Sequence, residues 1–233
     1  MQQLPLQFEF KGNENFGNFY PENNQELLEQ LKNCSAGNGQ PFIFLHGQSG
    51  HGKTHLLHAS CKHAQQQGRS SFYLGFTGSP LAEPEIVTGL ENYDLVCLDD
   101  IDRIAGDSVW ELAIFNLYNQ LQGLGHALIV ASSLKPNKAQ FSLPDLRTRL
   151  NWGLTLSVNS LSDTGKIAAL TLRAGQMGLE IPPAAGQFLL THYHRNLASL
   201  WTLLEQLDRA TLAAQRKLTV PFLKQFLTNN HDL

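Results

Sequence analysis

Residues 42–54 read FIFLHGQSGHGKT, an apolar run followed by a glycine-rich loop that ends in Lys53 and Thr54. The run Phe42–Leu45 is typical of a buried strand, and the residues after Thr54 open a helical segment. A glycine-rich loop in that position lets backbone N–H groups converge on phosphate oxygens at the start of a helix. Residues Gly47–Thr54 therefore predict a phosphate-binding loop for a nucleoside di- or triphosphate.

Both backbone and side-chain groups of the loop are predicted to contact the nucleotide or its metal. Lys53 adds a positive charge, and the hydroxyl of Thr54 is a ligand that Mg²⁺ accepts. The remaining predicted contacts with the phosphates come from Gly47, Gln48, Ser49, Gly50, His51 and Gly52.

A metal bound to the phosphates needs a further ligand, and residues 94–100 supply one. They read DLVCLDD, an apolar strand with two adjacent carboxylates at its end, which resembles a Walker B strand. Asp99 is the predicted second protein ligand of Mg²⁺, beside Thr54, and Asp100 is placed to orient a water molecule.

From residue 41 to residue 158, short strand patterns alternate with helix patterns, which predicts a parallel sheet in a three-layer α/β domain. The helical segment Asp107–Gln122 has its apolar residues on one face, spaced four, three and four apart, as expected for a helix packed on the sheet. The predicted strands are 41–46, 71–76, 93–98, 127–132 and 154–158.

After Val158 the strand patterns stop. A small all-helical second domain is predicted there, with prolines near the starts of two of its helices. The predicted helices are 162–177, 182–192, 196–214 and 220–227. We thus expect an extended tip over residues 1–12, an α/β domain over 13–159 and a helical domain over 160–233.

Composition and charge exclude several classes of protein. The chain has 42% hydrophobic and 16% charged residues, which is typical of a globular protein. Its formal charge of -3 argues against a surface built to neutralise nucleic-acid phosphates. The three cysteines lack metal-site or redox spacing, and no segment has the signature of a signal peptide or membrane span. We expect a cytoplasmic protein without a membrane partner.

A transition-metal site is the other chemistry that the loop region suggests. His51 and His55 have the i, i+4 spacing that can clamp such an ion. His51 lies inside the phosphate loop, however, and no carboxylate follows in a zinc-protease pattern. We therefore favour the nucleotide over a transition metal.

At this point the motifs resemble one family, the AAA+ ATPases of the DnaA group. Residues 47–57 read GQSGHGKTHLL, and the phosphate loop running into Thr-His-Leu-Leu is similar to that group. Residues Glu14–Phe19 resemble its entry segment, which lies beside the adenine. The resemblance implies that Phe19 and His55 contact ADP or ATP, and that the fold is an AAA+ P-loop core with a five-stranded parallel sheet and a helical lid.

Further matches follow in the same order along the chain. Residues Ile129–Ser133 resemble the first sensor strand, and Leu146–Leu154 resembles the segment that carries the arginine finger. Arg149 is the implied finger, with Arg147 as its competitor and Trp152 expected to be packed and to hold the loop in place. Arg195 resembles the second sensor, which reaches the nucleotide from the lid.

The N-terminal tip resembles the peptide by which replication proteins dock on the DNA polymerase sliding clamp, the beta subunit. The residues that carry this resemblance are Gln3, Leu4, Pro5, Leu6 and Phe8. The tip is shorter than the usual motif, so Gln2 competes with Gln3 for the glutamine pocket. The initiator of the group continues into a helix-turn-helix domain, whereas this sequence ends at Leu233, so we expect contact with DNA only through the clamp.

The resemblance implies a regulator that stimulates hydrolysis of the ATP bound to DnaA and thereby inactivates the initiator. Two alternatives stay open. One is a loader or recruiter of another replication factor, which would not need the clamp peptide. The other is an autonomous ATPase that forms a homo-oligomer, so that a neighbour's Arg149 completes its site. This alternative also requires that Asp100, where many AAA+ ATPases have Glu, supports hydrolysis of the chain's own ATP.

Overall fold

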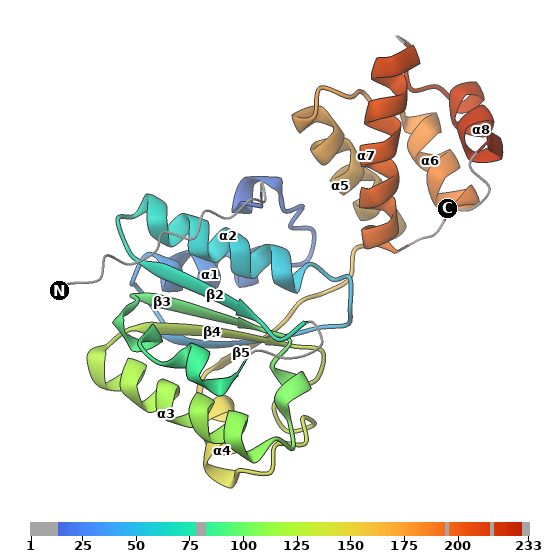
Figure 1. The fold of residues 1–233 in the computed structure, drawn as a ribbon. Helices are drawn as coiled ribbons and strands as arrows, with labels where there is room; N and C mark the ends of the chain where they lie inside the picture. The colour runs from blue at the N-terminus through green and yellow to red at the C-terminus, as the bar shows by residue number, and fades with distance from the viewer. Residues whose placement is uncertain (1–13, 78–82, 194–195, 215–216, 230–233) are drawn as a thin grey trace. The chain divides into compact units, whose positions relative to one another are not determined.

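The computed structural model describes residues 14–77, 83–193, 196–214 and 217–229 (Figure 1). The chain forms two compact units that divide between Asn159 and Ser160. The first unit contains a sheet with helices on both faces, and the second contains helices only.

The first unit is built on a five-stranded sheet in which the strands are parallel, in the order β2-β3-β4-β1-β5. The strands are β1 (Phe42–His46), β2 (Ser71–Gly75), β3 (Leu95–Asp99), β4 (Ala127–Ser132) and β5 (Leu154–Ser157). The predicted parallel sheet is confirmed. Because the strands are parallel, the loops that follow β1, β3 and β4 meet at the carboxyl edge of the sheet, which is where ligands bind in open α/β sheets.

Alternate residues of the strands face opposite layers, as the two-residue period of a strand requires. Ile43 and Leu45 of β1 pack against α1 (Gln25–Ser35) and α2 (Lys53–Gln66). Phe44 faces the other way, into the core formed with α3 (Ser108–Leu124) and α4 (Pro144–Trp152). Figure 1 shows the two helical layers on either side of the sheet.

Helix α3 forms where the apolar stripe predicted it. Trp110, Ile114, Leu117 and Leu121 are all buried in the core. Asp107 caps the helix by accepting hydrogen bonds from the N–H groups of Val109 and Trp110, at 3.0 and 3.2 Å. The helix ends at Gly125, which adopts a left-handed conformation with φ of +73°.

Strand β3 differs from the prediction because it starts at Leu95 instead of Tyr93 and extends to Asp99. Just before the strand, the carboxylate of Asp94 accepts hydrogen bonds from the N–H and the hydroxyl of Ser70, at 2.8 and 2.7 Å. Short 3-10 helices fill the connections: η1 (Phe16–Asn18), η2 (Pro84–Val87), η3 (Leu90–Asn92) and η4 (Ile101–Ile104).

The end of the first unit is fixed by a reciprocal amide pair. The N–H of Asn159 donates to Asn24 Oδ1 at 2.8 Å, and Asn24 Nδ2 donates to the Asn159 carbonyl at 3.2 Å. A third bond joins Asn159 Nδ2 to the carbonyl of Asn23 at 3.0 Å. The chain therefore leaves the sheet domain at a fixed point.

The second unit is a small helical domain with its own apolar core, as predicted. Its helices are α5 (Asp163–Gln176), α6 (Pro183–His192), α7 (Leu197–Ala214) and α8 (Val220–Asn229). Leucines dominate the core, among them Leu170, Leu189, Leu203 and Leu223. Across the described residues of both units, every helix is too short or too polar to cross a bilayer.

Candidate functional site

The predicted phosphate loop lies between β1 and α2, at the carboxyl edge of the sheet. Gly50 and Gly52 have φ angles of +82° and +94°, a region that glycine adopts without steric cost. A Cβ on Gly52 would lie 2.9 Å from the Phe19 ring, and one on Gly47 would lie 2.9 Å from the Val158 carbonyl oxygen. Each glycine is thus required by backbone conformation or by a close approach.

Lys53 and the start of α2 give the loop its preference for anions. The buried ammonium group of Lys53 donates to the carbonyl oxygens of Gly47 and Gln48, at 2.8 and 3.2 Å, so it is held over the loop. Gly52 at the N-cap offers no side chain for the first N–H groups of α2. Those groups, the helix dipole and the lysine together favour a phosphate here.

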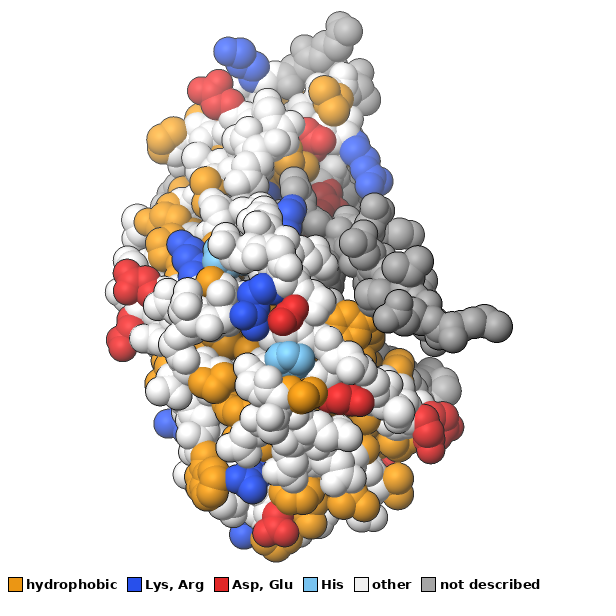
Figure 2. All heavy atoms as spheres, turned by 90° about the vertical axis from the view of Figure 1, so that its left-hand side faces the viewer, with side chains coloured by type: hydrophobic (Ala, Val, Ile, Leu, Met, Phe, Trp, Pro, Cys, Tyr) orange, Lys and Arg blue, Asp and Glu red, His pale blue; other side chains and the backbone are white. Residues whose placement is uncertain are grey.

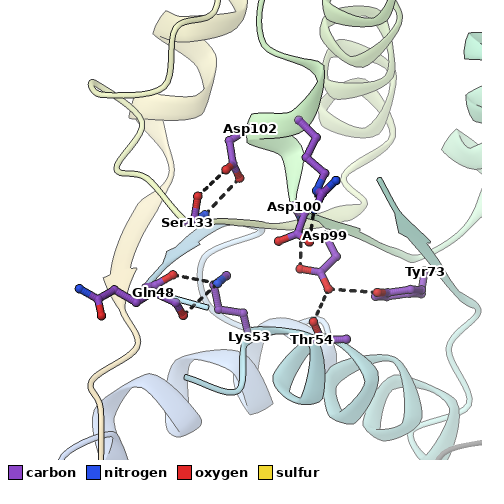
Figure 3. A network of polar contacts seen from close by, with 10 residues as sticks. Gln48, Lys53, Thr54, Tyr73, Asp99, Asp100, Asp102 and Ser133 are labelled. Carbon is purple, nitrogen blue, oxygen red and sulfur yellow. Dashed lines mark hydrogen bonds and ion pairs between the residues drawn. The ribbon is translucent and has the colours of Figure 1, made fainter. Parts of the chain in front are cut away.

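Thr54 and Asp99 meet as the sequence predicts, although they are 45 residues apart. Thr54 Oγ1 donates to Asp99 Oδ2 at 2.6 Å, and the Tyr73 hydroxyl donates to the same oxygen at 3.0 Å (Figure 3). The N–H of Asp100 binds the other carboxylate oxygen at 3.0 Å. Burial and the charge of Asp99 raise the pKa of Tyr73 far above its usual value, which keeps the phenol protonated as a donor.

The oxygens of Thr54 and Asp99 suit Mg²⁺ because this ion prefers oxygen ligands and is usually held by one or two protein groups together with substrate phosphates. Among the described residues, no group of three or more His, Cys, Asp or Glu side chains is arranged to hold a metal by itself. The residues therefore fit a magnesium ion that arrives with a nucleotide. When bound, the ion would neutralise charge on the phosphates.

Asp100 has an unusual backbone, with φ of +55° and ψ of +43°. Non-glycine residues in this left-handed region are uncommon, and they concentrate at functional sites. Its carboxylate lies 3.9 Å from Arg103 Nε. Burial and the neighbouring charge of Asp99 raise the pKa of Asp100, an effect that Lys53 partly offsets. A carboxylate with a raised pKa is a better proton acceptor, which suits a residue that orients water.

Asp102 belongs to the same network, and the sequence analysis missed it. Its carboxylate accepts hydrogen bonds from the N–H of Ser133 at 3.1 Å and from the Ser133 hydroxyl (Figure 3). Burial would raise the pKa of Asp102, but the bonds from Ser133 hold it below its ordinary value. The contact ties the loop after β3 to the end of the sensor-like segment Ile129–Ser133. Three acidic residues among residues 99–102 were the available signal.

The ring nitrogens of His51 and His55, near the loop, are hydrogen-bonded to backbone carbonyl groups. His51 Nδ1 is hydrogen-bonded to the carbonyl of Val158 at 2.9 Å, which ties the loop to the end of the first unit. His55 Nε2 lies 3.1 Å from the carbonyl of Asn15, and its ring contacts Phe19 with centroids 5.5 Å apart. Phe19 and His55 thus lie beside Gly52, where the resemblance places the nucleotide.

Arg149 lies on α4, so the expectation of a loop was wrong. Leu146 and Leu150 are buried on one face of this helix. Trp152, expected to be packed, is 65% exposed. The reason is helical geometry, because two residues beyond Leu150 correspond to a rotation of about 200° around the helix. The indole contacts Arg149 instead, with the guanidinium carbon 4.6 Å from its ring centroid.

The location of Arg149 separates it from the phosphate loop of its own chain. Its guanidinium also lies 5.7 Å from the ring of Tyr118, which stacks on Phe42 at the first residue of β1. Arg149 and Phe42 line the same small hollow. The phosphate loop starts at Gly47, after the carboxyl end of β1. At ~3.3 Å per residue, Gly47 lies about 16 Å along the strand from Phe42.

Two groups of predicted residues lie outside the described residues. They are Arg195, the second-sensor candidate, and the clamp-binding set Gln3, Leu4, Pro5, Leu6 and Phe8. On the described part of the face drawn in Figure 2, Lys and Arg side chains are scattered among acidic and uncharged ones and do not gather into a continuous basic area.

Comparisons with known proteins bear on the fold and on the helical domain. Residues 163–227 match the family model described as Hda, lid domain. The replication initiator DnaA bound to AMPPCP and single-stranded DNA is 21% identical, with a TM-score of 0.72 over 89% of this chain and 70% of that chain. Domain III of Thermotoga maritima DnaA is 18% identical, with a TM-score of 0.78 over 93% of this chain and 96% of that one.

A motor protein has a similar fold. The Thermotoga maritima RuvB Holliday junction branch migration motor is 16% identical, with a TM-score of 0.64 over 88% of this chain and 68% of that chain. At these identities the structural likeness establishes the fold alone, and the lid match applies to residues 163–227. The chain thus has the fold of the similar DnaA structures, a five-stranded parallel sheet with helices followed by a helical domain, and residues 163–227 are similar to the Hda lid domain.

Proposed function

We propose that this chain is a cytoplasmic, nucleotide-bound regulator of replication initiation that stimulates hydrolysis of the ATP bound to DnaA while docked on the sliding clamp. In this proposal ADP or ATP with Mg²⁺ occupies Gly47–Thr54 and Asp99, and Arg149 acts on the nucleotide of DnaA. Nucleotide binding is supported by the loop geometry and by the AMPPCP named for the similar DnaA structure.

The observation that carries the proposal is the position of Arg149. The side chain lies beside the amino-terminal end of β1, whereas the chain's own phosphate loop follows the carboxyl end. An arginine held at this distance from its own site is suited to a nucleotide on another molecule. Its planar guanidinium can stabilise the charge that builds on the phosphoryl group during transfer.

The direct test mixes the purified chain with clamp-loaded DNA and DnaA carrying γ-labelled ATP, while the chain itself carries unlabelled ADP. We expect the label to be released from DnaA at a rate that rises with the concentration of the chain. Release only from ATP supplied to the chain itself would indicate an autonomous ATPase. Retention of a third protein on DNA without any label release would indicate a loader.

Clamp docking can be tested separately through the tip. A free extended peptide with a polar Gln and apolar Leu and Phe anchors suits preformed pockets. We expect Leu4→Ala combined with Leu6→Ala to weaken clamp binding measured by surface plasmon resonance, with thermal unfolding unchanged. The matched control is Leu212→Ala, a 70% exposed leucine on the second unit. Equal clamp affinity for the wild type and a chain beginning at Gly12 would refute this part of the proposal.

A further inference from the structure

Helix α4, which carries Arg149, has no cap of its own. Its N-cap residue is Leu143, whose side chain makes no capping hydrogen bond, and Pro144 follows at the first helical position. The helix has nine residues and buries only Leu146 and Leu150. So short a helix is marginal in isolation, and its position depends on contacts from other elements.

Glu111 of α3 instead binds the two residues that precede α4, Ser142 and Leu143. This carboxylate is fully buried. Its Oε2 accepts a hydrogen bond from the N–H of Leu143 at 2.6 Å, and its Oε1 accepts from the N–H and hydroxyl of Ser142 at 3.0 and 3.1 Å. Oε1 also accepts from the N–H of Gly106 at 2.7 Å. Burial would raise the pKa of Glu111, but these bonds hold it below its usual value, so the group is a carboxylate at neutral pH.

The same face of α3 also supports the far end of α4. Tyr118 lies seven residues after Glu111, a spacing that returns to one face of a helix. Its ring contacts the guanidinium of Arg149 at 5.7 Å. Helix α3 therefore holds α4 at two points, its start and its arginine.

We propose that Glu111 is the positioning residue for Arg149: its buried carboxylate fixes the start of α4 against α3, and the fixed helix sets where the guanidinium is presented to the partner's nucleotide. The inference rests on the proposed function, because the partner whose nucleotide Arg149 reaches is the DnaA of that proposal. It does not depend on docking to the sliding clamp. Both oxygens are used, so a neutral amide of the same shape cannot replace the carboxylate, because its NH₂ would face an N–H donor.

The test compares Glu111→Gln with the wild type in two measurements. Hydrogen exchange followed by mass spectrometry should show that exchange in residues 145–152 is faster than in the wild type, with a smaller change or none in β1 and β4. In the DnaA assay we expect the maximal rate of label release to fall about 10–100-fold, because a misplacement of about 1 Å can cost a factor of 10². The half-saturating concentration and the chain's own ADP affinity should change little.

The matched control is Ser162→Ala, which removes the cap of α5 in the second unit and leaves α3 and α4 unchanged. It reports what a loss of helix stability alone does to both measurements. Ser142→Ala removes a single donor and should change both in the same direction by less, which keeps the test decisive if Glu111→Gln fails to fold.

Exchange in residues 145–152 of Glu111→Gln that rises no more than in the Ser162→Ala control would overturn the inference, as would an undiminished maximal rate in Glu111→Gln. A wild-type chain that fails to stimulate DnaA would instead contradict the proposed function. In that case the exchange measurement alone decides whether Glu111 holds α4.

Discussion

Replacing Arg149 with alanine is expected to abolish nearly all stimulation of DnaA-bound ATP hydrolysis, with a loss of ~10³–10⁵ in rate, the range for arginines that act in trans. The guanidinium is half-buried between the rings of Trp152 and Tyr118, so the thermal unfolding of the variant is measured beside its activity. Arg149→Lys should rescue little, because an ammonium group lacks the planar, bidentate geometry. Single-turnover release of labelled phosphate from DnaA measures the effect.

The matched control is Arg147→Ala. Arg147 is exposed on the same helix, two residues before Arg149. Its replacement by alanine removes the same charge. It should retain stimulation if position matters more than charge. Undiminished stimulation by Arg149→Ala would refute the assignment, and a loss of the chain's own ADP affinity would point to a role in its own site.

Lys53→Ala should remove most of the stabilisation that adenine nucleotides give the wild type. A ligand at ~100 times its dissociation constant adds about 2.7 kcal/mol to the free energy of unfolding. The ammonium group is buried over the loop carbonyls, where its charge is poorly screened and directed at the phosphates. Thermal unfolding of the first unit with and without ADP and Mg²⁺ measures the shift.

Lys62→Ala serves as the comparison, because Lys62 is a half-buried lysine on the same helix, α2, away from the loop. It should keep the full nucleotide-dependent shift. Both variants are also melted without nucleotide, so that a general loss of stability is not mistaken for a loss of binding. A wild type whose unfolding is indifferent to ADP and ATP would contradict the central expectation of a nucleotide site.

Most of the fold was predictable because its signals are local. Apolar runs such as Ala127–Ser132 and the apolar stripe of α3 predict which residues are buried. The glycines of the phosphate loop predict its backbone conformation. The contact between Thr54 and Asp99 was also predictable, because the loop after β1 and the end of β3 both lie at the carboxyl edge of one parallel sheet. A local pattern plus one topological rule was enough for these features.

The parts that sequence did not predict depend on partners distant along the chain. Helix α4 has a weak apolar stripe and an N-cap leucine, so its start is set by Glu111, 32 residues away from Leu143. The bond between Asp102 and Ser133 joins two loops that only the sheet brings together. The prediction that Trp152 is packed was wrong because its segment was expected to be a loop. Helical periodicity, which places Trp152 on the exposed side, was therefore not applied.

The left-handed backbone of Asp100 bears on which amino acids this position tolerates. Many AAA+ ATPases have Glu here, but Asp and Asn are the non-glycine residues most at ease with a positive φ. The shorter acid is therefore matched to the turn that ends β3, and a longer side chain would gain reach toward water only by straining the main chain. Asparagine is the replacement that removes the charge while keeping this turn.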